Sequence, residues 1–252
     1  MALIKTEEEI KKIEIAGRIL ASVLKKLAAE VKVGVKIELF DQLAKKLIRE
    51  AGAEPAFLNY HPYGAERPYP CSLCVSINDA VVHGLPKKKI LQDGDVVKLD
   101  IGVRYQGYYA DGAITLGVGE VSEIAKKLMR TCEVALAAGL KAARAGNRLG
   151  DIGYAVQSVT EKAGFSVIKG LTGHGIGEEL HEEPTVFNEG RAGLGMELKE
   201  GMVLAIEPMI SVGAPEVIQL KDDSYAAEDG SLTAHFEHTV LITEKGPRIL
   251  TN

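Results

Sequence analysis

The 252-residue chain has no tryptophan, few aromatic residues (5%) and only three cysteines, Cys71, Cys74 and Cys132. An odd cysteine count without a secretory signal is typical of a protein from a reducing compartment. We expect no such signal, because the start "MALIKTEEEIKK" has no long apolar core. No apolar run is long enough to span a bilayer. These absences predict a cytoplasmic protein without a membrane partner.

The chain also lacks a basic cluster, and its formal net charge is -5. A mildly acidic chain of this kind argues against nucleic acid as the main partner. The short run "KKK" at 87–89 is better explained as a solvated turn than as a binding patch. With 46% hydrophobic residues the composition is that of an ordinary globular protein.

Cys71 and Cys74 have the C-x-x-C spacing of half a zinc site. No second C-x-x-C or nearby histidine pair completes such a site. We therefore favour free thiols in a pocket wall or in the core.

The first and second parts of the chain contain the same kinds of segment in the same order. A capping box at Thr6 and Glu9 opens a helical apolar pattern, and Ser122 opens another. Each pattern is followed by a glycine and by a second helix that ends in Ala-Gly, at 51–52 and 163–164. Ordered internal similarity of this kind indicates a duplicated architecture.

The repeat continues into segments of β character. "HGLP" at 83–86 parallels "HEEP" at 181–184, and "ADGAITL" at 110–116 parallels "FEHTVLI" at 236–242. Coincidence between common helix–glycine–strand patterns is the alternative explanation. We predict a single domain, 1–252, made of two related halves, about 1–118 and 119–252, that close around a shared site.

Four acids occupy matched places in this repeat. "VVKLD" ends in Asp100 and "VLAIE" ends in Glu207, while Asp111 and Glu237 precede apolar runs. A carboxylate inside a sheet must be paired, protonated or bound to a metal, whereas any one of them could be a solvent-facing acid at a strand end. Four acids at matched places favour a metal. With an imidazole they would suit two adjacent Mn, Fe, Co or Zn ions bridged by shared carboxylates.

Five motifs in order resemble the bacterial type I methionine aminopeptidase family: "INDAVVHGLP", "LDIG…ADG", "TGHGIG…HEEP", "AIEPM" and "FEHT". The resemblance covers essentially the whole chain and implies the pita-bread fold, a pseudo-twofold α/β catalytic domain with a central antiparallel sheet flanked by helices. It implies metal ligation by Asp100, Asp111, His174, Glu207 and Glu237. Asp111 and Glu237 would bridge two divalent ions, His174 and Glu207 would complete one shell, and Asp100 would hold the other ion.

The resemblance implies removal of the initiator methionine from nascent chains, by attack of a metal-bridged hydroxide on the first peptide bond. Glu207 would accept a proton, His181 would hydrogen-bond the scissile carbonyl, and His83 would contact the scissile nitrogen. Without the resemblance, both histidines would be read as loop residues. The implied methionine pocket contains Tyr60, Tyr63 and Cys74, for which ordinary packing is the alternative. We expect a monomer that meets nascent polypeptides through transient ribosome association.

The sequence departs from the family pattern around the pocket. Residues 64–73 form a longer pocket-edge loop, and the flap near Asp223 is polar and has no tryptophan. Leu180 stands where an aromatic residue often precedes the histidine. His235 replaces a common glutamine, and we interpret it as a surface histidine or as a group that tunes Glu237, with preference for the second.

An Xaa-Pro aminopeptidase or prolidase of the same fold is the main alternative. Such relatives usually carry an extra N-terminal domain and an Asp after the last metal Glu, where this chain has His238. Residues 208–236 are too few for the helical insertion of a type II methionine aminopeptidase. A non-catalytic binding module on the same fold would have lost metal ligands, whereas this chain has all five. A phosphate-binding loop at "GHGIG" is disfavoured by the acidic "EELHEEP" that follows.

Overall fold

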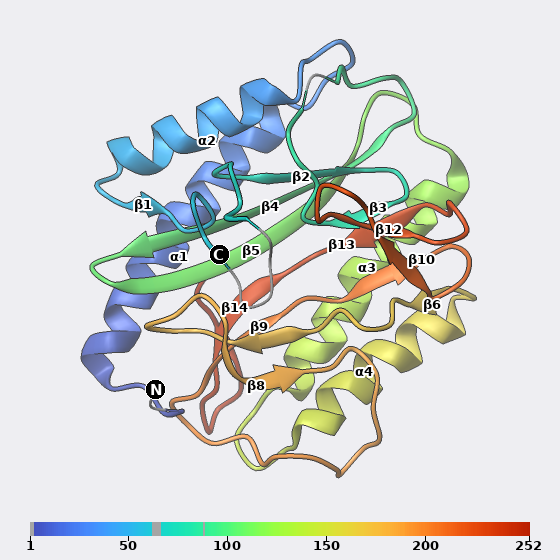
Figure 1. Ribbon diagram of the computed structural model, residues 1–252. Coiled ribbons are helices and arrows are strands. Elements are labelled where there is room, and N and C mark those ends of the chain that lie inside the picture. The colour runs from blue at the N-terminus through green and yellow to red at the C-terminus, as the bar shows by residue number, and fades with distance from the viewer. Residues whose placement is uncertain (1–2, 62–66, 88) are drawn as a thin grey trace.

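The computed structural model describes residues 3–61, 67–87 and 89–252. Four helices occur among these residues: α1 (Glu7–Ala29), α2 (Glu38–Glu50), α3 (Glu123–Ala142) and α4 (Leu149–Lys162). The strands are β1 (Glu54–Pro55), β2 (Cys74–Ile77), β3 (Ala80–Val82), β4 (Val96–Tyr105), β5 (Tyr108–Gly117), β6 (Ser166–Val167), β7 (Gly173–Gly175), β8 (Glu182–Val186), β9 (Val203–Ile206), β10 (Met209–Ser211), β11 (Val217–Gln219), β12 (Tyr225–Ala227), β13 (Thr233–His235), β14 (His238–Leu241) and β15 (Arg248–Ile249). Figure 1 shows the helix pair of each half beside the strands.

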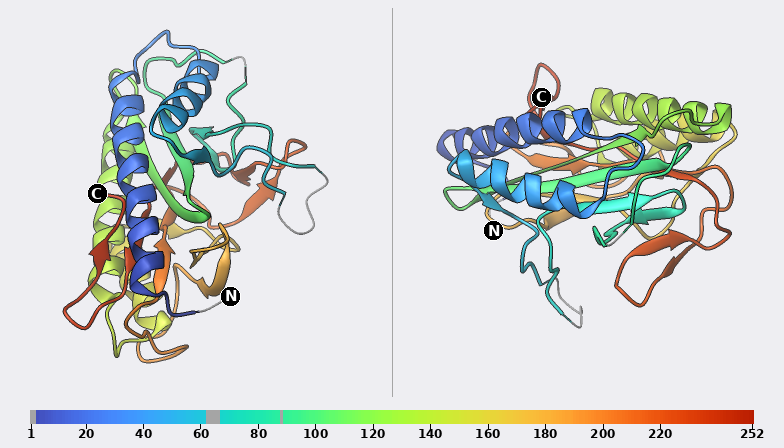
Figure 2. Two further views of the ribbon diagram at one scale, coloured as in Figure 1. Left: turned by 90° about the vertical axis from the view of Figure 1, so that its left-hand side faces the viewer. Right: turned by 90° about the horizontal axis from the view of Figure 1, so that it is seen from above.

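The helices begin where the sequence predicts. The Thr6 side chain accepts from the Glu9 backbone N–H and Glu9 reciprocates, which confirms the capping box of α1. Ser122 caps α3 by accepting from the backbone N–H of Ala125. The apolar stripe of α1 packs on β4 and β5, and that of α3 packs on β9, β10 and β13. Figure 2 shows α1 and α3 together on one face of the strand layer.

The strands form antiparallel sheets in each half. In the first half β4 pairs with β1, β2 and β5, and in the second half the order is β15-β14-β9-β7-β8. Two smaller sheets have the orders β13-β10-β6 and β11-β12-β3, and the latter brings the two halves together. Each half has its own buried apolar cluster, one around α1, α2 and β4 and the other around α3, α4 and β9.

The two halves meet along β5. The backbone N–H of Glu237 donates to the carbonyl of Ala113 at 2.9 Å, and that of Asp111 donates to Oγ1 of Thr239 at 2.9 Å. Thr115 Oγ1 donates to the carbonyl of His235 at 2.5 Å. The junction therefore places Asp111 and Glu237 on adjacent segments at the centre of the molecule.

The acids sit differently in the strands of the two halves. In the first half, β4 continues beyond Asp100 to Tyr105, and β5 begins before Asp111. The continuation is possible because Gln106 and Gly107, both at positive φ, form a tight hairpin turn. In the second half, β9 does stop before Glu207, which precedes a proline that cannot donate to a ladder.

None of the described helices combines the length and the apolar character that crossing a membrane requires.

Candidate active site

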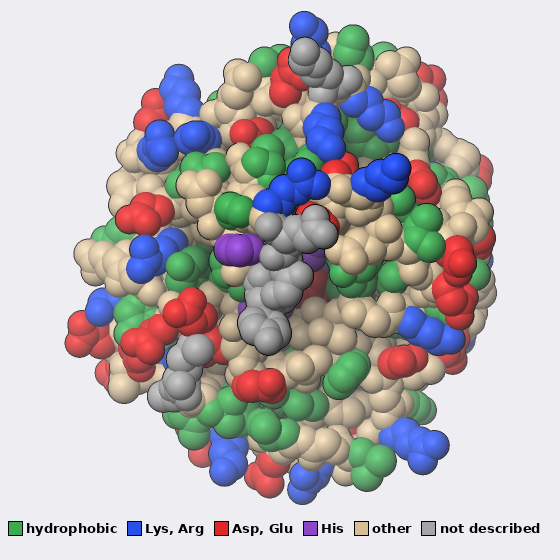
Figure 3. Space-filling view, viewed as in Figure 1, with side chains coloured by type: hydrophobic (Ala, Val, Ile, Leu, Met, Phe, Trp, Pro, Cys, Tyr) green, Lys and Arg blue, Asp and Glu red, His purple; other side chains and the backbone are tan. Residues whose placement is uncertain are grey.

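A cavity of about 890 Å³ reaches the junction of the two halves. The four acids from the repeat, together with His83, His174 and His181, line it. Figure 3 shows histidine side chains near the centre of one face. Seven groups selected from the sequence are thus gathered in one cavity.

The first-half acids stand on facing strands. Asp100 lies on β4 opposite Ala113, and Asp111 lies on β5 opposite Gly102. The exposed fractions of Asp100 and Asp111 are only 8% and 4%. Oδ1 of Asp111 accepts from the backbone N–H of Gly112 at 2.9 Å, whereas buried Oδ1 of Asp100 has no hydrogen-bond partner among the described residues.

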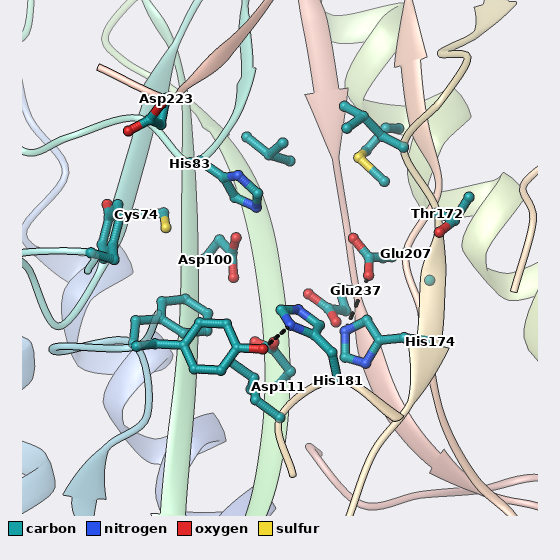
Figure 4. A pocket seen from close by; sticks show the side chains of 18 of the residues that line it. Cys74, His83, Asp100, Asp111, Thr172, His174, His181, Glu207, Asp223 and Glu237 are labelled. Carbon is teal, nitrogen blue, oxygen red and sulfur yellow. Dashed lines mark hydrogen bonds and ion pairs between the residues drawn. The ribbon is translucent and has the colours of Figure 1, made fainter. Parts of the chain in front are cut away.

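The second-half acids stand between strands. Glu207 separates β9 from β10, and Glu237 separates β13 from β14. Their exposed fractions are 9% and 3%. Ligand atoms of Asp111, His174 and Glu237 all lie within 4.8 Å of one another, as do those of Glu207, His235 and Glu237. Glu237 is therefore shared by two three-residue groups, and Asp100 belongs to neither (Figure 4).

Burial makes the charged forms of these carboxylates costly. It raises the pKa of Asp111 to about 7 and raises the pKa values of Asp100, Glu207 and Glu237 well above their usual range. Repulsion from Asp111 adds to the shift for Asp100, Glu207 and Glu237. No Lys or Arg ion pair reaches the four acids within the described ranges. A cation held between them would remove this cost.

His174 is prepared to donate a lone pair. It lies on β7, and its Nδ1 is 2.8 Å from the carbonyl of Gly175, which can only accept, so Nδ1 carries the proton. Nε2 then presents its lone pair, 3.5 Å from Oε1 of Glu207. Burial lowers the pKa of His174 to about 4, which keeps the ring neutral at pH 7. A neutral imidazole with a fixed tautomer is the usual form of a metal-ligating histidine.

His181 and His83 line the cavity outside these groups. The rings of His174 and His181 meet edge to face with centroids 4.4 Å apart. Water reaches His181 and His83 from the cavity, yet the surrounding protein lowers the pKa of both, that of His181 to about 3. His83 has a φ of 59° and packs its ring on Tyr225. Both histidines are neutral at pH 7 and available for hydrogen bonding to a substrate.

His235 lies behind the cavity, not on the surface. Its exposed fraction is 1%, and Nε2 is 3.4 Å from Oε2 of Glu207 and 3.8 Å from Oε2 of Glu237. Both ring nitrogens lack a hydrogen-bond partner in the described part of the chain. The interpretation as a surface histidine is wrong. The ring lies beside two of the predicted metal ligands, with Glu207 the nearer one.

The sequence analysis missed Lys98, two residues before Asp100. Its exposed fraction is 1%, and Nζ donates to the carbonyls of Asn78 at 2.7 Å and Thr233 at 3.1 Å. Burial lowers the pKa of Lys98 to about 7. A lysine inside an apolar run gives no signal of this role, because its partners are backbone carbonyls from distant segments. Lys98 ties the first half to β13 of the second.

The predicted methionine pocket is partly described. Tyr60, Cys74 and Leu180 line the cavity, while Tyr63 lies outside the described residues. None of the three cysteines forms a disulfide in the described part of the chain, and Cys74 is buried opposite Asp100 on the neighbouring strand. At the mouth, Lys87 Nζ is 2.8 Å from Oδ2 of Asp222, a contact between the halves that the sequence analysis did not identify.

Comparison with known proteins decides the family. Metallopeptidase family M24 matches residues 11–244. The chain belongs to this family. It is 45% identical to the methionine aminopeptidase of Aquifex aeolicus, with 98% of this chain and 97% of that protein covered. The structure of methionine aminopeptidase from Thermotoga maritima matches with a TM-score of 0.95 and 42% identity, with both chains fully covered.

The prolidase from Pyrococcus furiosus is a more distant neighbour. Its TM-score is 0.78 at 26% identity, and the match covers 99% of this chain but 65% of that one. These matches confirm the predicted pita-bread fold and favour the methionine aminopeptidases over the prolidase alternative. Family M24 uses divalent metal, and the buried acids and His174 offer oxygen and nitrogen donors suited to such ions.

Proposed function

We propose that the enzyme removes the N-terminal methionine from nascent proteins and peptides, using two divalent ions. The observation that carries this proposal is the meeting of four buried acids and His174 in one cavity of a family M24 chain. The proposed ligands are Asp100, Asp111, His174, Glu207 and Glu237. The set supports Co, Mn, Fe or Zn, and when bound the ions would activate water and polarise the scissile carbonyl.

The proposed roles of the protein groups are those that the family resemblance implies. Glu207 lines the cavity and belongs to one of the three-residue groups, and it would accept a proton from the attacking water. His181 would donate a hydrogen bond to the scissile carbonyl oxygen, and His83 would contact the scissile nitrogen. Asp100, outside both three-residue groups, would hold the second ion. The free α-amine of the substrate would bind at that ion, which would restrict cleavage to chain ends.

The side-chain pocket is proposed for the adjoining part of the cavity. Tyr60 and Cys74 supply an aromatic ring and a thiol, surfaces on which a thioether packs well. Nascent chain ends are the expected partner, met as a monomer during transient ribosome association. The whole chain, 1–252, would act as a single catalytic domain.

Peptide cleavage tests this function. Metal-free enzyme reconstituted with Co, Mn, Fe or Zn should release methionine from Met-Ala peptides and leave Xaa-Pro peptides intact. Each peptide set is assayed with the same enzyme sample, and metal-free enzyme is the blank. Preference for the Xaa-Pro set would reject the assignment in favour of a prolidase-like activity.

A further inference from the structure

Two neighbouring histidines in the cavity have different partners at the same ring atom. Nδ1 of His174 faces the carbonyl of Gly175 at 2.8 Å, whereas Nδ1 of His181 faces the hydroxyl of Tyr60 at 2.7 Å (Figure 4, dashed line at His181). The carbonyl fixes the tautomer of His174, because only a protonated Nδ1 can donate a hydrogen bond to it. A hydroxyl can donate or accept, so the chemistry around Tyr60 decides the proton position on His181.

Tyr60 is better suited to donate than to accept. A phenol is more acidic than a neutral imidazole N–H, which makes the O–H to nitrogen arrangement the stronger one. In the described part of the chain, the Tyr60 hydroxyl has no second partner that could take its proton. Burial together with Glu179 raises the pKa of Tyr60, so the hydroxyl keeps its proton. Nδ1 of His181 then accepts, and Nε2 carries the hydrogen.

The backbone holds Tyr60 firmly for this contact. Its N–H donates to the carbonyl of Phe57 at 2.9 Å, and its carbonyl accepts from the N–H of Tyr69 at 2.8 Å. The N–H of Asn59 returns a bond to the carbonyl of Tyr69 at 2.8 Å. The Tyr60 and His181 rings also pack edge to face with centroids 5.2 Å apart. The donor is thus supplied from a fixed point and needs no substrate to bring it into place.

We propose that Tyr60 is a positioning residue that holds His181 in the Nε2–H tautomer, opposite to the tautomer of His174. The inference rests on the proposed function, in which His181 donates to the scissile carbonyl oxygen. With Nε2–H the ring is a donor toward the substrate and has no lone pair on that atom for a metal. The two tautomers therefore give different roles to two histidines whose ring centroids are 4.4 Å apart: His174 is a metal ligand and His181 is a hydrogen-bond donor.

The experiment measures the tautomer directly. Metal-free protein with ¹⁵N-labelled histidine is examined by NMR at pH 7, and the His181 signals are assigned with His181→Asn. Wild-type protein should show a protonated Nε2 and a hydrogen-bonded, bare Nδ1. Tyr60→Phe keeps the ring and removes the donor, so the Nδ1 signal should move to that of a free nitrogen. We expect kcat on Met-Ala peptides to fall roughly tenfold, with a smaller change in KM.

Tyr69→Phe is the matched control. Tyr69 lines the same cavity, but its hydroxyl donates to the carbonyls of Leu73 and Gly84 at 3.2 and 3.0 Å. This variant should leave the His181 nitrogen signals unchanged, even if it lowers stability.

A protonated Nδ1 on His181 in wild-type protein would overturn the proposal, and so would identical His181 signals in wild-type and Tyr60→Phe protein. Because the tautomer is read from metal-free protein, this result is independent of substrate preference. A preference for Xaa-Pro peptides would reject the proposed function and leave the tautomer measurement standing.

Discussion

In the first half Asp100 and Asp111 stand on an unbroken hairpin of two ten-residue strands, whereas Glu207 and Glu237 stand in gaps between short strands. The imidazoles in contact with the acids also come from one half only, because His174 and His235 face the two oxygens of Glu207 at 3.5 and 3.4 Å. A continuous hairpin fixes its acids through the backbone ladder. Acids in gaps depend more on neighbouring side chains.

Despite this difference in backbone setting, we expect equal loss of activity at the junction, where Asp111 and Glu237 lie on adjacent segments. Asp111→Asn and Glu237→Gln should each lower kcat/KM on Met-Ala peptides by about 10³-fold or more, because several kcal/mol of metal-derived stabilisation are lost. Metal content per chain, measured by mass spectrometry of the reconstituted protein, should fall in both variants. Asp95→Asn is the control, because Asp95 is a buried acid bonded to Asn78 and Gln92 and is not a proposed ligand. The metal content of this variant should equal that of the wild-type protein. Metal content that fell in only one of the two would break the equivalence of the halves.

His174 and His181 should separate metal binding from chemistry. His174→Ala should weaken metal binding roughly 10- to 100-fold or more, while His181→Ala should retain metal and lose about 10²–10³-fold in kcat, as for a missing oxyanion donor. Calorimetric metal titration and peptide cleavage measure the two effects. If the variants exchanged behaviour, the role assignment would be wrong.

A smaller effect on metal affinity should show that the position of Glu207 depends on neighbouring side chains. His235→Ala removes the imidazole at 3.4 Å and should weaken metal affinity roughly tenfold without loss of stoichiometry. His235→Gln should recover part of the loss, since an amide can donate to the same carboxylate. His238→Gln is the control, because His238 bonds to Thr251. Unchanged affinity in His235→Ala would show that Glu207 is fixed by its own backbone.

The smallest predicted effect concerns pH. The pKa of Asp111 is raised from 3.8 to about 7 in the folded protein, so the folded state binds more protons than the unfolded state between these values. The associated stability is present below about pH 4 and is lost as pH rises toward 7. The melting temperature of metal-free wild-type protein should therefore fall by a few degrees relative to that of Asp111→Asn as the pH rises across this range. A constant difference between the two proteins would contradict the raised pKa.

Many of the helix boundaries could be predicted from the sequence because short-range signals determine them. Thr6 and Ser122 mark helix starts by short-range capping, and matched glycines such as Gly52 and Gly164, at φ 74° and 84°, mark helix ends. The four acids were found because duplication places them at corresponding points. Their convergence in one cavity follows from the fold, which the family resemblance supplied.

The rest depends on contacts between distant segments. The partners of Lys98 are carbonyls that no pattern of residue types predicts. The Tyr60–His181 bond joins residues 121 positions apart, which only the folded chain brings together.

The central claim is that acids from both halves hold divalent metal at their junction. Anaerobic calorimetric titration of metal-free protein with Co or Mn, checked by elemental analysis under reducing conditions, tests it most directly. The account predicts two ions per chain in the wild-type protein and loss of tight binding in both Asp111→Asn and Glu237→Gln. Two ions bound with unchanged affinity in these variants would contradict it.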